Sequence, residues 1–155
     1  MGRYYRTDNG AEGKFMFGVQ PSDDPAEMGM HEQDPQVINY YADEDDVPAI
    51  TKKLDEQYDK LGVPKEQRIY SYDKYEEAIK FEEDVLTDRV FIHVKADDTE
   101  ARKKYGNITW CSSKGNDYVD YEKEGMAICL ARVRLALDIL SDIKKTGYCS
   151  LEAEV

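Results

Sequence analysis

Carboxylates, histidines and cysteines are the residues of this sequence that could do chemistry. The run Asp43-Glu44-Asp45-Asp46 offers the oxygen atoms that hard cations prefer. A calcium loop, however, alternates its ligands and adds a glycine and a distant bidentate glutamate. The run has none of these features, so the sequence predicts no metal site there. Two uses remain open for it: the capped, solvated start of a helix, or a surface that binds a partner.

The two histidines, His31 and His93, lie far apart in the sequence and belong to no metal-binding or hydrolase motif. Cys111 and His93 could be drawn as a nucleophile and its base, but only their residue types support that pair, because such pairs are recognised by geometry. The sequence also contains no phosphate-binding glycine loop. It therefore predicts a protein that is not an enzyme, with no catalytic residue, no metal and no cofactor.

The cysteines and the apolar runs indicate the cellular compartment. Cys111, Cys129 and Cys149 are an odd number of cysteines without a Cys-x-x-Cys pair, which suits neither a disulfide framework nor a zinc site. We expect them to be reduced thiols in the core. No run approaches the roughly 18 consecutive apolar residues of a membrane span, and no secretory signal is recognisable. We therefore expect a cytoplasmic protein.

The charge of the chain is strongly negative and unevenly distributed. Asp and Glu number 33 against 21 Lys and Arg, and the net charge is -12. The window 15–51 has no Lys or Arg, so its nine acids carry most of that charge. Binding nucleic acid means neutralising phosphates with cations, so we expect a basic protein surface as the partner and not nucleic acid itself. The nine acids are Asp23, Asp24, Glu27, Glu32, Asp34, Asp43, Glu44, Asp45 and Asp46.

Tyrosine is unusually abundant, with twelve copies in 155 residues. Its side chain gives a large contact area at low rotamer cost and is enriched at interfaces. The alternative is a tyrosine at the edge of the core with its hydroxyl in water. Tyr40 and Tyr41 lie just before the acidic run. We therefore predict that these two tyrosines and the nine acids form the partner-binding surface.

Two segments in the first third of the chain alternate in the manner of strands. Apolar residues recur at period two in 14–20, and the segment 37–42 places one of its two adjacent tyrosine rings on each face. Between them, 21–36 combines prolines with acids and predicts a loop with at most one helical turn.

Two other segments have the period of an amphipathic helix. Apolar steps of three and four from Val47 to Leu61 predict one helix, with Asp45 or Asp46 as its cap. The strongest periodicity of the chain, from Met126 to Ile143, predicts a long core helix.

The remaining segments are less regular. For 73–105 two interpretations stay open: a helix followed by a strand at 90–94, or two helices. The segment 107–116 predicts a short strand or loop, and alternation over 149–155 predicts a closing strand. Together these elements predict one α+β domain over residues 1–155, with a small, mainly antiparallel sheet and helices packed on one face.

An acidic surface can itself be functional. Carboxylates three or four residues apart on a helix lie about 5–6 Å from one another, comparable to the charge spacing of a nucleic-acid backbone. A groove built of Arg and Lys offers the same donors to both kinds of oxygen. Such a surface can therefore occupy a phosphate-binding groove, and complementary fields would speed the encounter.

Four stretches carry a resemblance to known proteins: GRYY at Gly2–Tyr5, GKFMFGVQPSDD at Gly13–Asp24, YYADEDD at Tyr40–Asp46 and GYCSLEAE at Gly147–Glu154. They resemble small proteins of phages and mobile elements of Gram-positive bacteria, among them inhibitors of the CRISPR nuclease Cas9. The resemblance implies an anti-CRISPR protein in the cytoplasm of a bacterial host cell. Such a protein binds the nuclease or its guide complex and blocks DNA binding or cleavage. No site residue follows from it.

The leading hypothesis is thus a non-enzymatic acidic inhibitor of a nucleic-acid enzyme. Two alternatives belong to other classes. The chain could be a structural or regulatory phage protein without a nuclease partner, or a small enzyme that uses a cysteine or a pair of carboxylates.

Overall fold

The computed structural model describes residues 3–16, 18–34, 37–106, 108–112 and 114–153. Five strands form the main sheet in the order β2-β1-β8-β4-β3, and every neighbouring pair is antiparallel. Three more form a second antiparallel sheet in the order β5-β7-β6. The strands are β1 (Arg3–Thr7), β2 (Glu12–Phe15), β3 (His31–Asp34), β4 (Val37–Asp43), β5 (Phe91–Lys95), β6 (Trp110–Cys111), β7 (Tyr118–Glu122) and β8 (Tyr148–Ala153).

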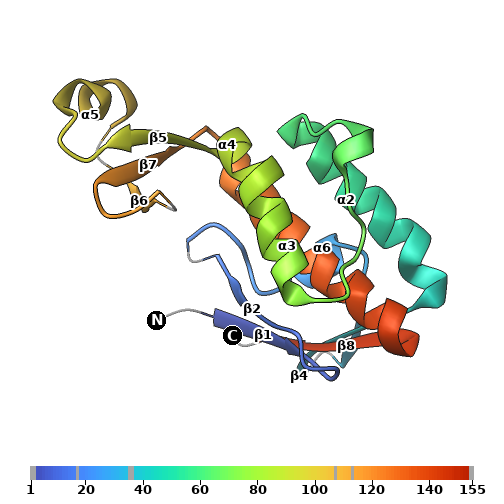
Figure 1. Cartoon of the computed structure of the whole chain (residues 1–155). Coiled ribbons are helices and arrows are strands. Elements are labelled where there is room, and N and C mark those ends of the chain that lie inside the picture. Colours follow the sequence, from blue (N-terminus) through green and yellow to red (C-terminus); the bar gives the residue numbers. More distant parts are fainter. Residues whose placement is uncertain (1–2, 17, 35–36, 107, 113, 154–155) are drawn as a thin grey trace.

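Helices cover one face of the main sheet, and no described helix lies on its other face (Figure 1). This confirms the predicted α+β architecture. The helices are α1 (Asp24–Glu27), α2 (Val47–Leu61), α3 (Tyr75–Phe81), α4 (Thr87–Val90), α5 (Thr99–Tyr105) and α6 (Met126–Thr146). A π-helical segment, η3 (Glu82–Leu86), joins α3 to α4, and two short 3₁₀ turns are η1 (Glu44–Asp46) and η2 (Lys65–Gln67).

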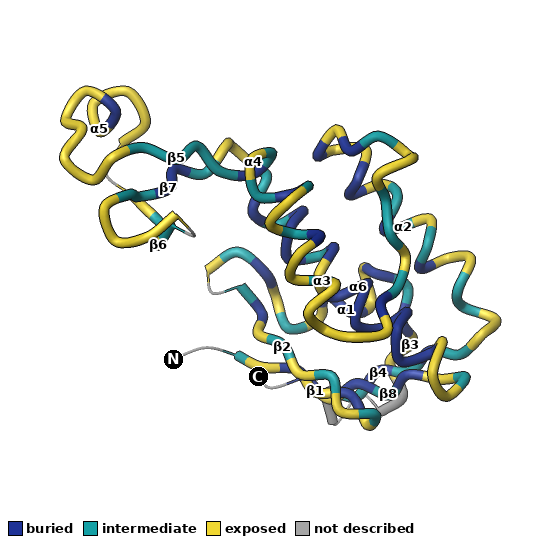
Figure 2. The backbone as a smooth tube through the Cα atoms, viewed as in Figure 1, coloured by how far each residue is buried: buried dark blue, intermediate teal, exposed yellow. Residues whose placement is uncertain are grey.

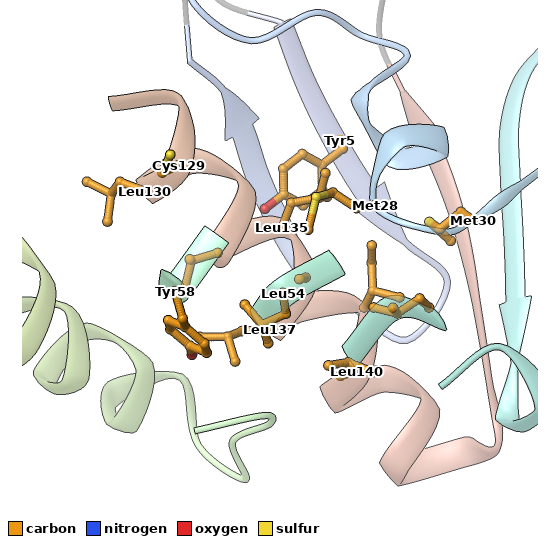
Figure 3. Packing of buried hydrophobic residues seen from close by; sticks show 14 of the residues in the cluster. Tyr5, Met28, Met30, Leu54, Tyr58, Cys129, Leu130, Leu135, Leu137 and Leu140 are labelled. Atoms are coloured by element: carbon orange, nitrogen blue, oxygen red, sulfur yellow. The ribbon is translucent and has the colours of Figure 1, made fainter. Parts of the chain in front are cut away.

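The long helix α6 lies at the centre of the molecule. It packs along α2 and against β8, and α4 also contacts it. Side chains that point in different directions around it, such as Leu135, Ala136 and Ile139, are all fully buried. Figure 3 shows Leu137 of α6 close to Leu54 and Tyr58 of α2 in this core. A helix that is apolar on nearly all sides must be enclosed, and here a sheet and two helical layers enclose it.

The second sheet and α5 form an arm, residues 91–122, that projects away from the main body (Figure 1). Most of the arm is exposed or half-buried, as the burial colouring of Figure 2 shows. Among its described residues, Ala101, Asp120 and Tyr121 are the buried ones. None of these three belongs to the main core cluster, although Phe91 and Trp110 pack against that cluster. The arm therefore has little core of its own.

Several predicted elements are confirmed with small changes of boundary. The helices predicted at Val47–Leu61 and from Met126 appear as α2 and α6, and the closing strand appears as β8. Each helix ends at a glycine in the left-handed region, Gly62 and Gly147. The strand predicted at 37–42 is β4. Between 73 and 105 the first interpretation holds, because a helical segment is followed by the strand β5, which begins at Phe91 and not at Val90, the last residue of α4. Trp110 lies in the short strand β6.

Other predictions were wrong. The strand predicted at 14–20 ends at Phe15, because the chain turns there: the backbone N–H of Val19 donates to the carbonyl oxygen of Met16. Phe17, which contributed to the alternation, lies outside the described residues. The segment 21–36 contains the predicted helical turn, α1, but also the strand β3. The strands form two sheets and not the single sheet that was predicted. Cys129 and Cys149 are buried as predicted, but Cys111 is exposed.

The strands β1 and β2 approach each other closely at the pair formed by Tyr5 and Gly13. The ring of Tyr5 lies directly over Gly13, where an added Cβ would stand 2.2 Å from the ring carbon Cζ. The substitution Gly13→Ala must therefore move the ring away from its place in the core. We expect the free energy of unfolding to fall by about 1–3 kcal/mol, measured by denaturant unfolding. The exposed neighbour Glu12→Ala is the control and should change it by less than about 0.5 kcal/mol. Equal effects of the two substitutions would contradict this account.

Candidate functional site

The acids predicted to bind a partner cluster around the edge strand β3. Five of them are exposed: Asp23, Glu27, Glu32, Glu44 and Asp45. We call these five residues the acidic edge. Asp23 and Glu27 belong to the start and end of α1, which contacts β3, and Glu32 lies in β3 itself. Glu44 and Asp45 lie in η1, which directly follows β4, the neighbour of β3 in the sheet.

Two contacts show that the parts of the acidic edge are close in space. After burial, the charges of Glu32 and Asp23 are the causes that raise the pKa of the Tyr40 hydroxyl above its ordinary value. Both carboxylates therefore lie near this one ring. At the neighbouring residue of β3, the Nε2 atom of His31 lies 2.7 Å from the Oδ1 oxygen of Asp46, which ties β3 to η1. Asp23 and Glu32 thus lie together, and η1 is tied to the same strand, whereas the carboxylate of Glu44 extends toward Gly147 at the end of α6.

Asp43 and Asp46 have a structural use at the start of η1 and α2. The backbone N–H of Asp45 donates to the Asp43 carboxylate over 2.9 Å, and the backbone N–H of Asp43 donates to the Asp46 carboxylate over 2.9 Å. This reciprocal pair is a capping box. Burial raises the pKa of Asp46, but the bond from Asp43 and the contact with His31 outweigh it and hold that pKa below its usual value. The cap was predicted at Asp45 or Asp46; the structure forms it from Asp43 and Asp46.

Asp24 and Tyr40 must be removed from the predicted surface, because both side chains are buried. The Asp24 carboxylate is fully enclosed and accepts hydrogen bonds from Nε2 of Gln20 at 2.7 Å and from Nε of Arg132 at 3.0 Å. Tyr40 is 3% exposed and belongs to the core. Tyr41 is half-buried on the open face of the sheet, where its ring stacks on Tyr148 with centroids 6.4 Å apart.

The side chain of Asp34 lies outside the part of the chain whose side chains the structure describes. Of the eleven predicted contact residues, five therefore form the acidic edge. Among the described residues, the ion pairs of the structure involve none of these five. Within the described part of the chain, these five charges are therefore exposed to solvent without an ion pair.

Cys111 and His93 do not form a nucleophile pair. Both lie in the second sheet, but His93 pairs across the strands with Asp120, whereas Cys111 pairs with Val119. Neighbouring residues of a strand point to opposite faces, so the thiol and the imidazole lie on opposite sides of the sheet. Both ring nitrogens also face carboxylates: Nδ1 lies 2.5 Å from Asp120 and Nε2 lies 2.9 Å from Asp88. The imidazole links the arm to α4.

Sequence reasoning missed a buried polar cluster in the middle of α6. Asp138 is 5% exposed, and its two oxygens accept hydrogen bonds from the hydroxyls of Tyr5 at 2.6 Å and Tyr72 at 2.5 Å. Burial is the main cause that raises the pKa of Asp138 to about 6, and the charge of Asp142 adds to it. Burial and the Asp138 carboxylate in turn raise the pKa of Tyr5. The signal was present in the sequence, because Asp138 interrupts the apolar stripe of the predicted helix.

Metal binding and membrane insertion find no support within the described part of the chain. No group of three or more His, Cys, Asp or Glu side chains there is arranged to hold a metal ion. None of the helices described has both the length and the apolar character required to cross a membrane.

The raised pKa of Asp138 predicts a pH dependence of stability. The unfolded carboxyl titrates near 3.9, whereas the folded one titrates at about 6. Between these two pH values the folded state keeps a proton that the unfolded chain loses. The stability that this proton contributes is fully present below about pH 3.9 and is lost as the pH rises through 6. The measured quantity is the difference in unfolding free energy between the native protein and the Asp138→Asn variant. We expect this difference to decrease by on the order of 2 kcal/mol between pH 4 and pH 7. Asp97→Asn, an exposed control, should give no such trend, and a flat difference for Asp138→Asn would refute the assignment.

Comparisons with known proteins gave no relative. No protein-family model matches the chain, and neither the curated proteins nor the solved structures contain a significant match. The function must therefore be argued from the geometry and the charges of the molecule itself. The acidic edge is the surface with the clearest chemical character.

Proposed function

We propose that this protein is a non-enzymatic binding protein that uses the acidic edge to occupy a basic surface of a nucleic-acid enzyme. The observation that carries the proposal is the set of five exposed carboxylates without ion pairs among the described residues. The other acids of the same window have structural partners: Asp24 pairs with Arg132, and Asp43 and Asp46 cap a helix. Neither this cap nor the described ion pairs involve the five carboxylates of the acidic edge.

The chemistry of the acidic edge fits a partner rich in arginine and lysine. Carboxylate and phosphate oxygens accept hydrogen bonds from the same guanidinium and ammonium groups. A net charge of -12 also repels nucleic acid and attracts a positively charged groove over a distance of about 10 Å at moderate salt. A protein with this surface can therefore compete with nucleic acid for a groove without binding nucleic acid itself.

The partner that we propose is a nuclease of the Cas9 type or its guide complex. This choice depends on the resemblance of four stretches of the sequence to small phage proteins, because the acidic edge alone identifies only the charge of the partner. Binding there would block DNA binding or cleavage in the bacterial cytoplasm. A phage interaction protein with no nuclease partner is the second candidate, since the same carboxylates would serve any basic surface.

The proposal predicts that charge reversal on the acidic edge weakens inhibition. In a variant with Glu27→Lys, Glu32→Lys and Asp45→Lys, three attractive contacts become repulsive. We expect binding to the nuclease–guide complex to weaken at least tenfold at about 0.1 M salt, measured by titration, together with a matching loss of inhibition in a DNA-cleavage assay. Binding of the native protein should also weaken as salt rises.

The matched control carries Glu56→Lys, Glu66→Lys and Glu83→Lys, three exposed acids on other helical segments, and has the same net charge. It should keep most of the affinity, and both variants should keep the unfolding midpoint within a few degrees. If the two variants lose affinity equally, the acidic edge is not the contact surface. If the native protein does not bind the complex at all, the nuclease partner is wrong, and retention on an unrelated basic protein would then favour the second candidate.

A further inference from the structure

An open groove of about 330 Å³ lies where the start of α2 meets the last turns of α6 (Figure 1). Val47 of α2 and Leu140 and Ile143 of α6 give it apolar walls, and Tyr70, from the segment between η2 and α3, also lines it. Its volume is at the small end of the range of about 300–1,000 Å³ that is usual for ligand sites. The groove therefore suits one long side chain better than a large ligand.

One member of the acidic edge, Glu44, lines this groove. Its side chain is exposed, and its carboxylate extends toward the end of α6, where a Cβ added at Gly147 would stand 3.3 Å from the Oε1 oxygen. The last carbonyl groups of a helix have no partner within the helix and carry a partial negative charge. A full and a partial negative charge thus meet beside the groove, and together they favour a cation.

Two lysines in the last turn of α6 could supply that cation, but each of them acts elsewhere. The Nζ atom of Lys144, which also lines the groove, lies 3.0 Å from an oxygen of Asp73. Lys145 lines a different pocket, where burial raises the pKa of Asp142 and the charge of Lys145 opposes that rise. Among the residues that the structure describes, no ion pair includes Glu44, so a cation from another molecule can bind there.

Tyr70 is held in place at the side of the groove. Its hydroxyl donates to Oδ1 of Asp55 over 2.7 Å, and its ring packs edge to face on Tyr58 with centroids 6.2 Å apart. The residue is 37% exposed, so part of its surface remains open to a partner. Aromatic rings attract guanidinium groups, and apolar walls accept the methylene groups of a long basic side chain. A guanidinium is also more weakly hydrated than an ammonium group, which favours arginine over lysine.

We propose that this groove receives an arginine side chain of the partner. The guanidinium group donates to the carboxylate of Glu44, and its stem packs against the apolar walls and the ring of Tyr70. The inference rests on the proposed function, because it names the residue type by which the acidic edge holds a basic partner. An arginine that fills a pocket contributes more to binding than charges at the exposed rim of an interface, so we expect this contact to dominate.

A peptide titration tests the groove without any nuclease. The probes are acetyl-Gly-Arg-Gly-amide, its citrulline counterpart, in which a neutral urea replaces the guanidinium, and its lysine counterpart. We expect saturable NMR shifts of the native protein with the arginine peptide, centred on residues 44–51, 70–71 and 140–144. The citrulline peptide should bind about tenfold more weakly, as the loss of a charged hydrogen bond implies. No saturable shift, or equal binding of these two peptides, overturns the proposal, and equal binding of the lysine peptide overturns the choice of arginine.

Two substitutions then locate the contact. Glu44→Gln should weaken binding of the arginine peptide about tenfold, whereas Glu66→Gln, the same change at an exposed residue of η2, should leave it unchanged. Thr51→Phe fills the groove without changing the charge and should weaken binding to a similar extent, with Thr99→Phe at the exposed start of α5 as its control. Unchanged binding by either folded groove variant overturns the assignment. If neither variant folds, the comparison of the three peptides on the native protein still decides.

Binding to the nuclease–guide complex separates this inference from the proposed function. If the native protein binds the arginine peptide in the groove but does not bind the complex, the groove is upheld and the nuclease partner is wrong. If Glu44→Gln binds the complex as tightly as the native protein, while charge reversal at Glu27, Glu32 and Asp45 weakens binding, the acidic edge is upheld and the inference about the groove is wrong.

Discussion

The rest of the structure depends on one constraint, the enclosure of α6. Its apolar side chains point in nearly every direction, so no single sheet or helix can bury them. The main sheet covers one side, α2 packs along another, and the segment that runs through α3 and α4 closes a third. The helix also buries the polar residues Asp138, Ser141 and Asp142. Asp138 is tolerated because two tyrosine hydroxyls from separate elements satisfy both of its oxygens. These bonds also fix how β1 and the loop before α3 are placed against the helix.

The sequence revealed the parts of the fold whose signal is local. The apolar periods of α2 and α6, their terminal glycines and the alternation of β8 all lie within single segments, and the structure confirms them. The strand β3 has the sequence HEQD, which has no apolar alternation, and it forms because β4 offers it a partner. A pairing of that kind cannot be predicted from either strand alone. The strand β1 was also missed, and one of its two neighbours in the sheet, β8, comes from a distant part of the chain.

For the candidate site, too, the sequence showed the local composition but not the contacts between residues that are distant in the chain. Composition identified the acid-rich window, and five of its acids are exposed. It could not separate those five from Asp24, whose partner Arg132 is more than 100 positions away. Nor could it foresee that Tyr40 faces the core while Tyr41 faces solvent, although the alternation did place them on opposite faces. In the sequence, the one sign of the polar cluster is that Asp138 interrupts the apolar stripe of the predicted helix. Its meaning depends on two tyrosines from elsewhere in the chain.

The position of β8 in the main sheet has a consequence for the order of assembly. This strand lies between β1 and β4, so it joins two hairpins that come from the first third of the chain. Until β8 has been synthesised, β1–β2 and β3–β4 have no common partner and each has an unpaired edge. The sheet therefore cannot close before β8 has left the ribosome, and contacts of such long sequence separation are slow to form. During synthesis the chain therefore passes through a stage in which the two hairpins β1–β2 and β3–β4 are not yet joined into one sheet by β8.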